Sequence, residues 1–277
     1  MSIWGERFLR GLTTGQMTRY TLKAAGRASL VSQRHRYELG LVDRPHLAYG
    51  LKAAATEARK LGHKSMTAIE FGVGAGNGLL AMEEHAAAVE TMTGVHISVV
   101  GFDAGNGLPE PMDYRDMPCQ WEGGFYPMDE DLLRSRLRCA ELVIGDVKTT
   151  AREFLGRADP LKPIGFASFD LDYWSSTIAA FDIFRGDRRA CLPRVWCFFD
   201  DIGWTVEDVG ELRAIRDFNE EPRPHRIRRQ HTLRSRLPFQ PLWADQFYQA
   251  HLFDHPDYNV LLADREAERV TLGEGWI

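Results

Sequence analysis

Short apolar runs alternate with helical stretches along most of the chain, and this alternation restricts the fold more than any other feature. Five of the runs predict strands, over residues 66–71, 97–102, 141–144, 164–169 and 195–199. Near-continuous apolar strands separated by helices are typical of a parallel sheet covered on both faces, so we predict a doubly wound α/β fold. Ligands bind at the carboxyl ends of the strands in such folds, and functional residues are therefore expected just after each strand.

Two helices flank the first predicted strand. Leucine and alanine recur at three- and four-residue steps from Asp43 to Gly62, with Pro45 near the start, which predicts an amphipathic helix. Residues 79–89 are rich in alanine, leucine and glutamate and predict a second helix. We expect residues 1–62 to form an N-terminal helical extension or lid, and residues 63–277 to form the main domain.

Composition excludes several classes of protein. With 277 residues, 44% of them hydrophobic, the chain can bury a sizeable core, so we do not expect disorder. It contains no run of about eighteen apolar residues and no signal-like start, which predicts a soluble, cytoplasmic protein without a membrane partner. A net charge of -5 disfavours nucleic acid as a partner, although residues 223–236 hold six arginines and no acid. That run could bind an anionic acceptor, but a solvated loop is the favoured interpretation.

Every predicted strand ends at an acid. These acids are Glu70, Asp103, Asp146, Asp170 with Asp172, and Asp200 with Asp201. A single aspartate after a strand commonly caps the next helix or stabilises a turn. Acids at all five strand ends indicate a functional site at that edge of the sheet.

A glycine-rich loop follows the first strand, with glycine at positions 72, 74, 76 and 78. Glycines let the backbone turn tightly and leave room for a ligand, and a nucleotide-type cofactor is the natural occupant. The dinucleotide pattern Gly-x-Gly-x-x-Gly fails at Asn77 in one register and at Leu79 in the other, and no P-loop lysine follows. A nucleotide-binding oxidoreductase is thus disfavoured.

The loop resembles the acid-x-Gly-x-Gly-x-Gly first motif of class I S-adenosylmethionine-dependent methyltransferases. Its matching residues are Glu70, Gly72, Gly74 and Gly76. The resemblance implies a Rossmann-like, mostly parallel sheet of seven strands in an S-adenosylmethionine-binding domain over residues 63–277. It also implies that Asp103 binds the ribose hydroxyls and that Asp146 lies near the adenine.

Four carboxylates end two strands that are separated by one helix: Asp170, Asp172, Asp200 and Asp201. Neighbouring parallel strands are roughly 4.8 Å apart, so these groups converge if the two strands are adjacent. Converging carboxylates raise each other's pKa unless a cation joins them, and all-oxygen ligands favour magnesium, calcium or manganese. Such an ion can orient a substrate hydroxyl toward a methyl donor while a general base removes the proton. The alternative is that these acids are helix caps and solvated turn residues.

The segment from Asp170 to Thr177, followed by Asp200 and Asp201, is similar to the macrocin O-methyltransferase family, bacterial enzymes that methylate sugar hydroxyls of natural products. Residues 107–111 and 210–218 agree with it. The resemblance implies Mg²⁺ on Asp170, Asp200 and Asp201, Asp172 as the catalytic base, and a homodimer. The chain departs from the family pattern at Leu171, Ser175 and Ile202, which leaves the acceptor-contacting surface open.

The resulting hypothesis is a divalent-metal-assisted O-methyltransferase that uses S-adenosylmethionine and acts on a sugar or other small-molecule polyol, with a glycoside as the suggested acceptor. A catechol-type phenol is the alternative acceptor. From other classes, a nucleotide-binding oxidoreductase and a catalytically silent cofactor-binding module stay open. Four aromatic residues could stack on a sugar ring, although core packing is favoured for them: Trp204, Trp243, Phe247 and Tyr248.

Overall fold

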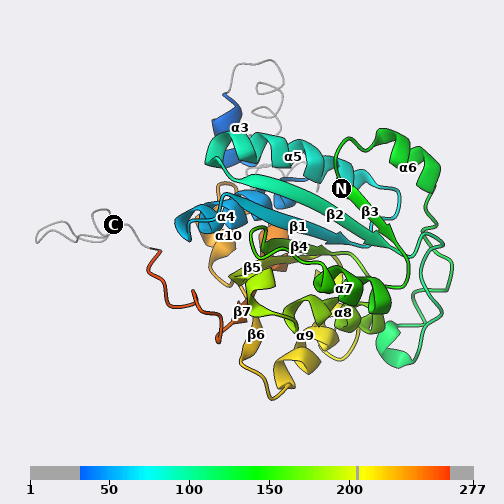
Figure 1. Cartoon of the computed structure of the whole chain (residues 1–277). Coiled ribbons are helices and arrows are strands. Elements are labelled where there is room, and N and C mark those ends of the chain that lie inside the picture. Colours follow the sequence, from blue (N-terminus) through cyan, green and yellow to red (C-terminus); the bar gives the residue numbers. More distant parts are fainter. Residues whose placement is uncertain (1–31, 204–205, 263–277) are drawn as a thin grey trace, which may run out of the picture.

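A seven-stranded sheet in the order β3-β2-β1-β4-β5-β7-β6 forms the centre of the protein (Figure 1). The computed structural model describes residues 32–203 and 206–262. The strands are β1 (Ser65–Phe71), β2 (His96–Asp103), β3 (Glu141–Ile144), β4 (Ile164–Phe169), β5 (Cys191–Phe199), β6 (His225–Arg229) and β7 (Phe247–Leu252). Strand β7 pairs antiparallel with both of its neighbours, and the pairs from β3 to β5 are parallel. The predicted mostly parallel, seven-stranded sheet is confirmed.

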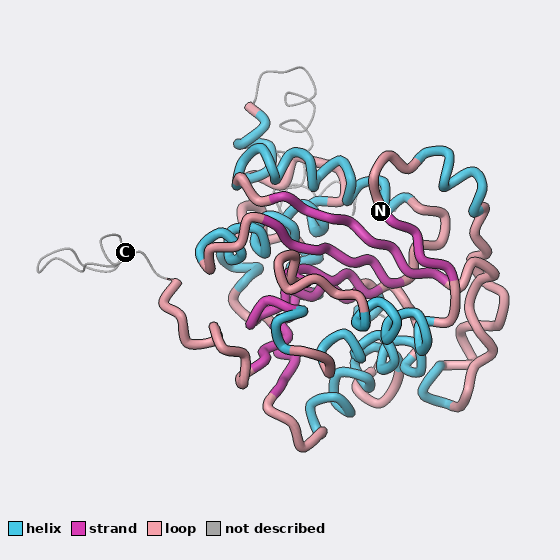
Figure 2. The backbone as a smooth tube through the Cα atoms, viewed as in Figure 1, coloured by secondary structure: helices cyan, strands magenta, loops and turns pink. Residues whose placement is uncertain are grey.

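Helices cover both faces of this sheet (Figure 2). The described helices are α3 (Gln33–Glu38), α4 (Pro45–Lys60), α5 (Asn77–Thr93), α6 (Glu130–Arg136), α7 (Val147–Gly156), α8 (Trp174–Ala180), α9 (Gly210–Glu220) and the short α10 (Leu233–Arg236). Apolar side chains of α4 and α5 pack against one face, and those of α7 and α9 pack against the other. The doubly wound arrangement follows from this, because each strand sends alternate side chains to opposite faces.

The alternation is visible within single strands. In β1, Ala68 joins the core under α4 and α5, whereas Ile69 joins the core under α7 to α9. In β5, Phe198 joins the core under α4 and α5, and Phe199 joins the core under α7 to α9. Strands buried on both faces must be apolar at every position, which is why the sequence shows continuous apolar runs.

The first predicted helix ends where expected, but its start differs. The periodic pattern begins at Asp43, whereas in the structure Arg44 is the N-cap, in a left-handed conformation (φ 42°), and Pro45 begins the helix. The proline fixes the start of the helix, so the residue before it takes the cap position. Helix α4 packs into the same core as the strands, and residues 1–31 lie outside the described part of the chain. The division at residue 62 therefore stays a prediction.

Four stacked phenylalanine rings cross the sheet at the carboxyl ends of its central strands. The ring centroids lie 4.9 Å apart for Phe102 and Phe71, 5.3 Å for Phe71 and Phe169, and 4.7 Å for Phe169 and Phe199. The four residues are buried and face each other in the strand register. Since Asp103, Asp170 and Asp200 each follow one of these residues, the row brings the acids to one level.

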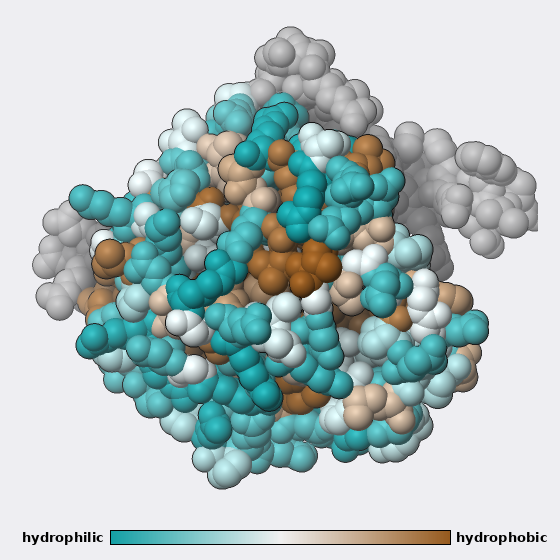
Figure 3. All heavy atoms as spheres, turned by 45° about the vertical axis from the view of Figure 1, so that its right-hand side comes forward, coloured by the Kyte–Doolittle hydropathy of each residue, from teal (hydrophilic) through white to brown (hydrophobic). Residues whose placement is uncertain are grey.

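The surface is mostly hydrophilic on the face shown in Figure 3, with one compact hydrophobic patch near its centre. Within the described ranges, no helix combines the length and the apolar character that crossing a bilayer requires.

Phe169→Ala tests the importance of the phenylalanine row. Phe169 is fully buried and stacks on two members of the row, so its truncation leaves a cavity and is expected to cost about 3–5 kcal/mol of unfolding free energy. Urea unfolding measures this loss. The control Phe253→Ala removes a ring that is 46% exposed and should cost less than about 1 kcal/mol. Equal losses in the two variants would contradict the prediction.

Candidate functional site

A cavity of about 660 Å³ opens at the carboxyl ends of β1 to β5, a size typical of sites for small ligands. Nine of the ten residues proposed from the sequence line it: Glu70, Gly72, Gly74, Asp103, Asp146, Asp170, Asp172, Asp200 and Asp201. The tenth, Gly76, does not. The structure therefore brings the glycine loop and the acidic cluster into one cavity.

The glycine loop crosses closely over the end of β4. Gly72 has φ 82°, and a side chain there would begin 1.8 Å from the carbonyl oxygen of Asp170. Gly78, in the first turn of α5, leaves room for the buried carboxylate of Glu70, whose Oε1 would lie 1.8 Å from an added Cβ. Only glycine permits both approaches. Burial raises the pKa of Glu70 well above its ordinary value, and the charge of Asp170 raises it further.

Asp103 holds the loop in place. Its Oδ2 accepts hydrogen bonds from the backbone N–H groups of Val73 (2.9 Å) and Gly74 (2.8 Å), and its Oδ1 accepts one from Gly105 (2.6 Å). A carboxylate oxygen has two lone pairs, so the loop uses both lone pairs of Oδ2, whereas Oδ1 can still accept from a ligand hydroxyl. Asp103 is therefore placed to shape the loop and to bind a ligand hydroxyl.

Two of the expected cofactor residues have structural roles. Gly76 has φ 83° and precedes α5, where a side chain would collide with Leu133 of α6 at 2.2 Å, so it has a structural role, and its place in the cofactor site stays a prediction. Asp146 caps α7 by accepting from the N–H of Lys148 at 2.8 Å, while still lining the cavity. The capping interpretation weighed for single acids thus holds at Asp146.

Asp170, Asp200 and Asp201 form a compact carboxylate cluster. One oxygen from each lies within 4.8 Å of the others. Burial and the neighbouring carboxylates raise the pKa of Asp170 to about 7 and that of Asp201 to about 8. Three oxygen donors at this separation fit a hard divalent cation, which would relieve the repulsion between them.

Asp172 lies beside this cluster in a strained conformation. It is buried, has φ 56°, and donates its backbone N–H to Asp201 Oδ2 at 3.2 Å. A left-handed conformation is unfavourable for a residue other than glycine, and such strain gathers at functional sites. Burial, together with the charge of Asp200, raises the pKa of Asp172 to about 6, which suits a general base near neutral pH.

Sequence reasoning missed two charged residues at the site. Arg44 lines the cavity, and its positive charge opposes the rise in the pKa of Glu70, Asp170 and Asp200. Glu211 is fully buried, and its Oε2 accepts from the N–H of Asp201 at 3.0 Å, while Oε1 has no hydrogen-bond partner among the described residues. The sequence does contain a signal for Glu211, because this acid lies on the same face of α9 as the buried apolar residues of that helix.

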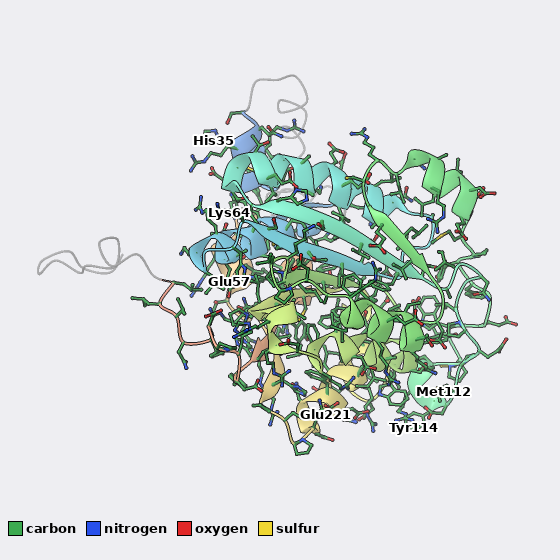
Figure 4. The ribbon with its side chains drawn as sticks, viewed as in Figure 1. His35, Glu57, Lys64, Met112, Tyr114 and Glu221 are labelled. Atoms are coloured by element: carbon green, nitrogen blue, oxygen red, sulfur yellow. The ribbon has the colours of Figure 1, made fainter. Side chains whose placement is uncertain are left out.

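A long connection between β2 and α6, residues 104–129, forms one wall of the cavity and was not assigned from the sequence. Met112 and Tyr114 lie on it, across the molecule from Glu57 and Lys64 (Figure 4). Trp121, Phe125 and Tyr126 of this connection line the cavity. These rings were missed because nothing local shows which way an irregular segment folds.

Other aromatic and basic candidates lie elsewhere. Trp243, Phe247 and Tyr248 belong to the two hydrophobic cores, as the favoured interpretation expected, and Trp204 is outside the described residues. Of the arginines in residues 223–236, all of which the structure describes, none lines the cavity. Arg229 and Arg234 pair instead with Asp245.

Comparisons with known proteins give matches among solved structures. No protein-family model and no curated protein matches the chain. A crystal structure of CalS11, a calicheamicin methyltransferase, matches with 23% identity over 64% of this chain and 72% of its own, at a TM-score of 0.45. An apo structure of CalS11, described as a TDP-rhamnose 3'-O-methyltransferase in calicheamicin biosynthesis, matches with 21% identity over 74% and 84%, at a TM-score of 0.39. Membership of the macrocin O-methyltransferase family stays a prediction.

The raised pKa values of Asp170 and Asp201 predict how stability depends on pH. The folded protein holds these protons more tightly than the unfolded chain, whose carboxyls titrate near pH 4. Metal-free protein should therefore lose stability as the pH rises from about 5 to about 8. Mg²⁺ competes with these protons, so it should raise the unfolding temperature most at the upper end of this range, by at least about 3 °C at saturation.

Thermal unfolding with and without Mg²⁺ across this pH range makes the measurement. Asp201→Asn should flatten the pH dependence and remove the effect of Mg²⁺. Asp159→Asn, an exposed aspartate outside the cavity, should change neither. A wild-type protein that is indifferent to Mg²⁺ at every pH would contradict the cation site.

Proposed function

We propose that the protein is an S-adenosylmethionine-dependent, divalent-metal-assisted O-methyltransferase that acts on a hydroxyl of a sugar or other small-molecule polyol. The observation that carries the proposal is one shared cavity. The glycine loop held by Asp103 opens onto it from β1, and the three-carboxylate cluster with Asp172 opens onto it from β4 and β5. A methyl donor on the loop and a hydroxyl at the cluster would therefore lie next to each other.

The cofactor half of the cavity fits an adenosyl group with a charged amino-acid tail. Asp103 lines the cavity, and its Oδ1 keeps a lone pair that can accept from a ribose hydroxyl. The glycine loop leaves its backbone uncovered along the same wall, so the ligand can lie directly against the main chain. Asp146 lines the far side, at the place proposed for the adenine.

The acceptor half supplies orientation and proton transfer. Asp170, Asp200 and Asp201 would hold a divalent cation, which supplies Lewis-acid polarisation of the acceptor hydroxyl when bound. A carboxylate oxygen of Asp172 accepts the hydroxyl proton as the oxygen attacks the methyl carbon of the sulfonium donor, and the thioether leaves with the electron pair of the broken bond. The remaining contribution is proximity and alignment of the two reactants.

Isothermal titration with S-adenosylhomocysteine tests the cofactor assignment. We expect binding of this product and none of NADH, whose binding would instead support an oxidoreductase. If S-adenosylhomocysteine does not bind, the methyltransferase proposal is overturned. Asp103→Ala should weaken binding, because it removes both the hydroxyl acceptor and the loop anchor.

Asp172→Asn tests the proton acceptor. The variant should bind S-adenosylhomocysteine normally but lose about 10²–10⁴-fold in turnover, the range typical for removing a general base. Methyl transfer to a panel of glycosides and catechols provides the measurement, with Asp159→Asn as the matched control. Unchanged turnover in Asp172→Asn would exclude this residue as the base, and cofactor binding without any turnover would favour a silent binding module.

The catechol-type phenol is the second candidate acceptor, because the three aromatic rings on the cavity wall could also stack on a planar acceptor. The same acceptor panel separates the two. A homodimer and a cytoplasmic location stay predictions from the sequence.

A further inference from the structure

Three aromatic rings gather at the acceptor side of the cavity. We refer to Trp121, Phe125 and Tyr126 as the ring cluster. The centroids of Trp121 and Tyr126 lie 6.0 Å apart with planes at 62°, and those of Phe125 and Tyr126 lie 6.1 Å apart at 82°. Two of the rings are open to solvent, since Phe125 is 41% exposed and Tyr126 is 55% exposed. Exposed rings at an angle to one another form a partly open cup beside the cavity.

The ring cluster is held in place by its flanking backbone. Leu108 donates its N–H to the carbonyl of Phe125 at 2.8 Å, and Gly124 donates to the carbonyl of Leu108 at 2.8 Å. Asp116, which is fully buried, accepts from the N–H groups of Met112 and Ser175, both at 2.8 Å, and so ties the connection to α8. The rings are therefore preorganised on the cavity wall.

Negative charge surrounds the ring cluster. The Glu110 carboxylate packs against the backbone at Gly123, where an added Cβ would lie 2.4 Å from Oε1. Tyr126 lines the same cavity as Asp170, Asp172 and Asp201; burial raises the pKa of its phenol, and the charges of these carboxylates raise it further. Ring faces carry a negative electrostatic potential, so rings and acids together attract a cation.

Acidic residues also outnumber basic residues over the whole cavity lining. Among its described lining residues, eight are acids and two, Arg44 and Lys148, are bases. A divalent cation and the single net positive charge of S-adenosylmethionine would still leave the acids in excess. The arginines of residues 223–236 do not compensate, because none of these described residues lines the cavity. An anionic acceptor is therefore disfavoured.

We propose that the acceptor is positively charged, an amino sugar whose protonated amine binds at the ring cluster beside Glu110 while a neighbouring hydroxyl faces Asp172. This inference rests on the proposed function for the role of the hydroxyl. The cation site itself depends only on the rings and the acids. Cation–aromatic attraction acts at the faces of the rings, and the carboxylate of Glu110 adds a direct charge partner.

Three probes of matched shape test the cation site: choline, its neutral isostere 3,3-dimethylbutan-1-ol, and the anion 3,3-dimethylbutyrate. Their affinities for the full-length protein are measured by ligand-observed NMR titration, with Mg²⁺ and S-adenosylhomocysteine present. Choline should bind about 5- to 30-fold more tightly than the alcohol, and the anion most weakly. Equal affinities, a preference for the anion, or no binding of choline would overturn the proposal.

Substitutions at the ring cluster and at Glu110 test whether the preference for choline arises there. Tyr126→Leu and Glu110→Gln should each reduce the preference for choline over the alcohol. Tyr114→Leu is the matched control, because Tyr114 is an exposed ring of the same connection that does not line the cavity. The Tyr114→Leu variant should prefer choline over the alcohol to the same extent as the wild-type protein. Thermal unfolding shows that each variant is folded, and an unchanged preference in both cavity variants would contradict the assignment.

The same samples separate this inference from the proposed function. If S-adenosylhomocysteine binds and choline shows no preference, the cation site fails and the methyltransferase proposal stands. If choline is preferred and S-adenosylhomocysteine does not bind even with Mg²⁺, the methyltransferase proposal fails and the cation site stands.

Discussion

Stacking of four phenylalanine rings across β2, β1, β4 and β5 is the interaction on which the site depends. The rings fix how these strands are aligned, and the backbone pairing continues one residue past them, where Asp170 donates to the carbonyl of Phe71 and Asp200 donates to that of Phe169. The acids therefore leave the sheet at the same height. A slip of one residue would turn every side chain to the opposite face, so the register and the carboxylate cluster are set together.

The cluster that this register creates is unfavourable without a partner for its charge. Asp170, Asp200 and Asp201 repel one another, and Glu211 adds a buried carboxyl with one oxygen that no group in the described part of the chain hydrogen-bonds. Arg44 supplies an opposing charge from the start of α4, a helix that otherwise serves as a cover for the sheet. An arrangement that lowers the stability of the free protein is expected where a cation or substrate supplies the missing charge.

The parts that could be predicted from the sequence are those that local chemistry determines. Strand ends were visible because a phenylalanine is followed by an aspartate in β2, β4 and β5, and the glycine loop was visible from its spacing. The other features of the site depend on packing between elements that are distant in the sequence. Gly76 turns toward Leu133 because α6 lies there, and Arg44 meets the acids only because α4 crosses the sheet. Trp121 and Tyr126 reach the cavity because Asp116 bonds to a residue 59 positions later in the chain.

The connection between β2 and α6 is anchored at its base, by Asp116 and by the pairing of Leu108 with residues 124–125, and the anchors are separate from the rings that they carry. Exchange of a ring therefore leaves the acids, the glycine loop and the strand register where they are. A fold built in this way can acquire a new acceptor through changes in a few exposed positions. For the proposed methyltransferase, natural divergence should consequently concentrate in residues 117–126, and directed evolution of acceptor range would begin there.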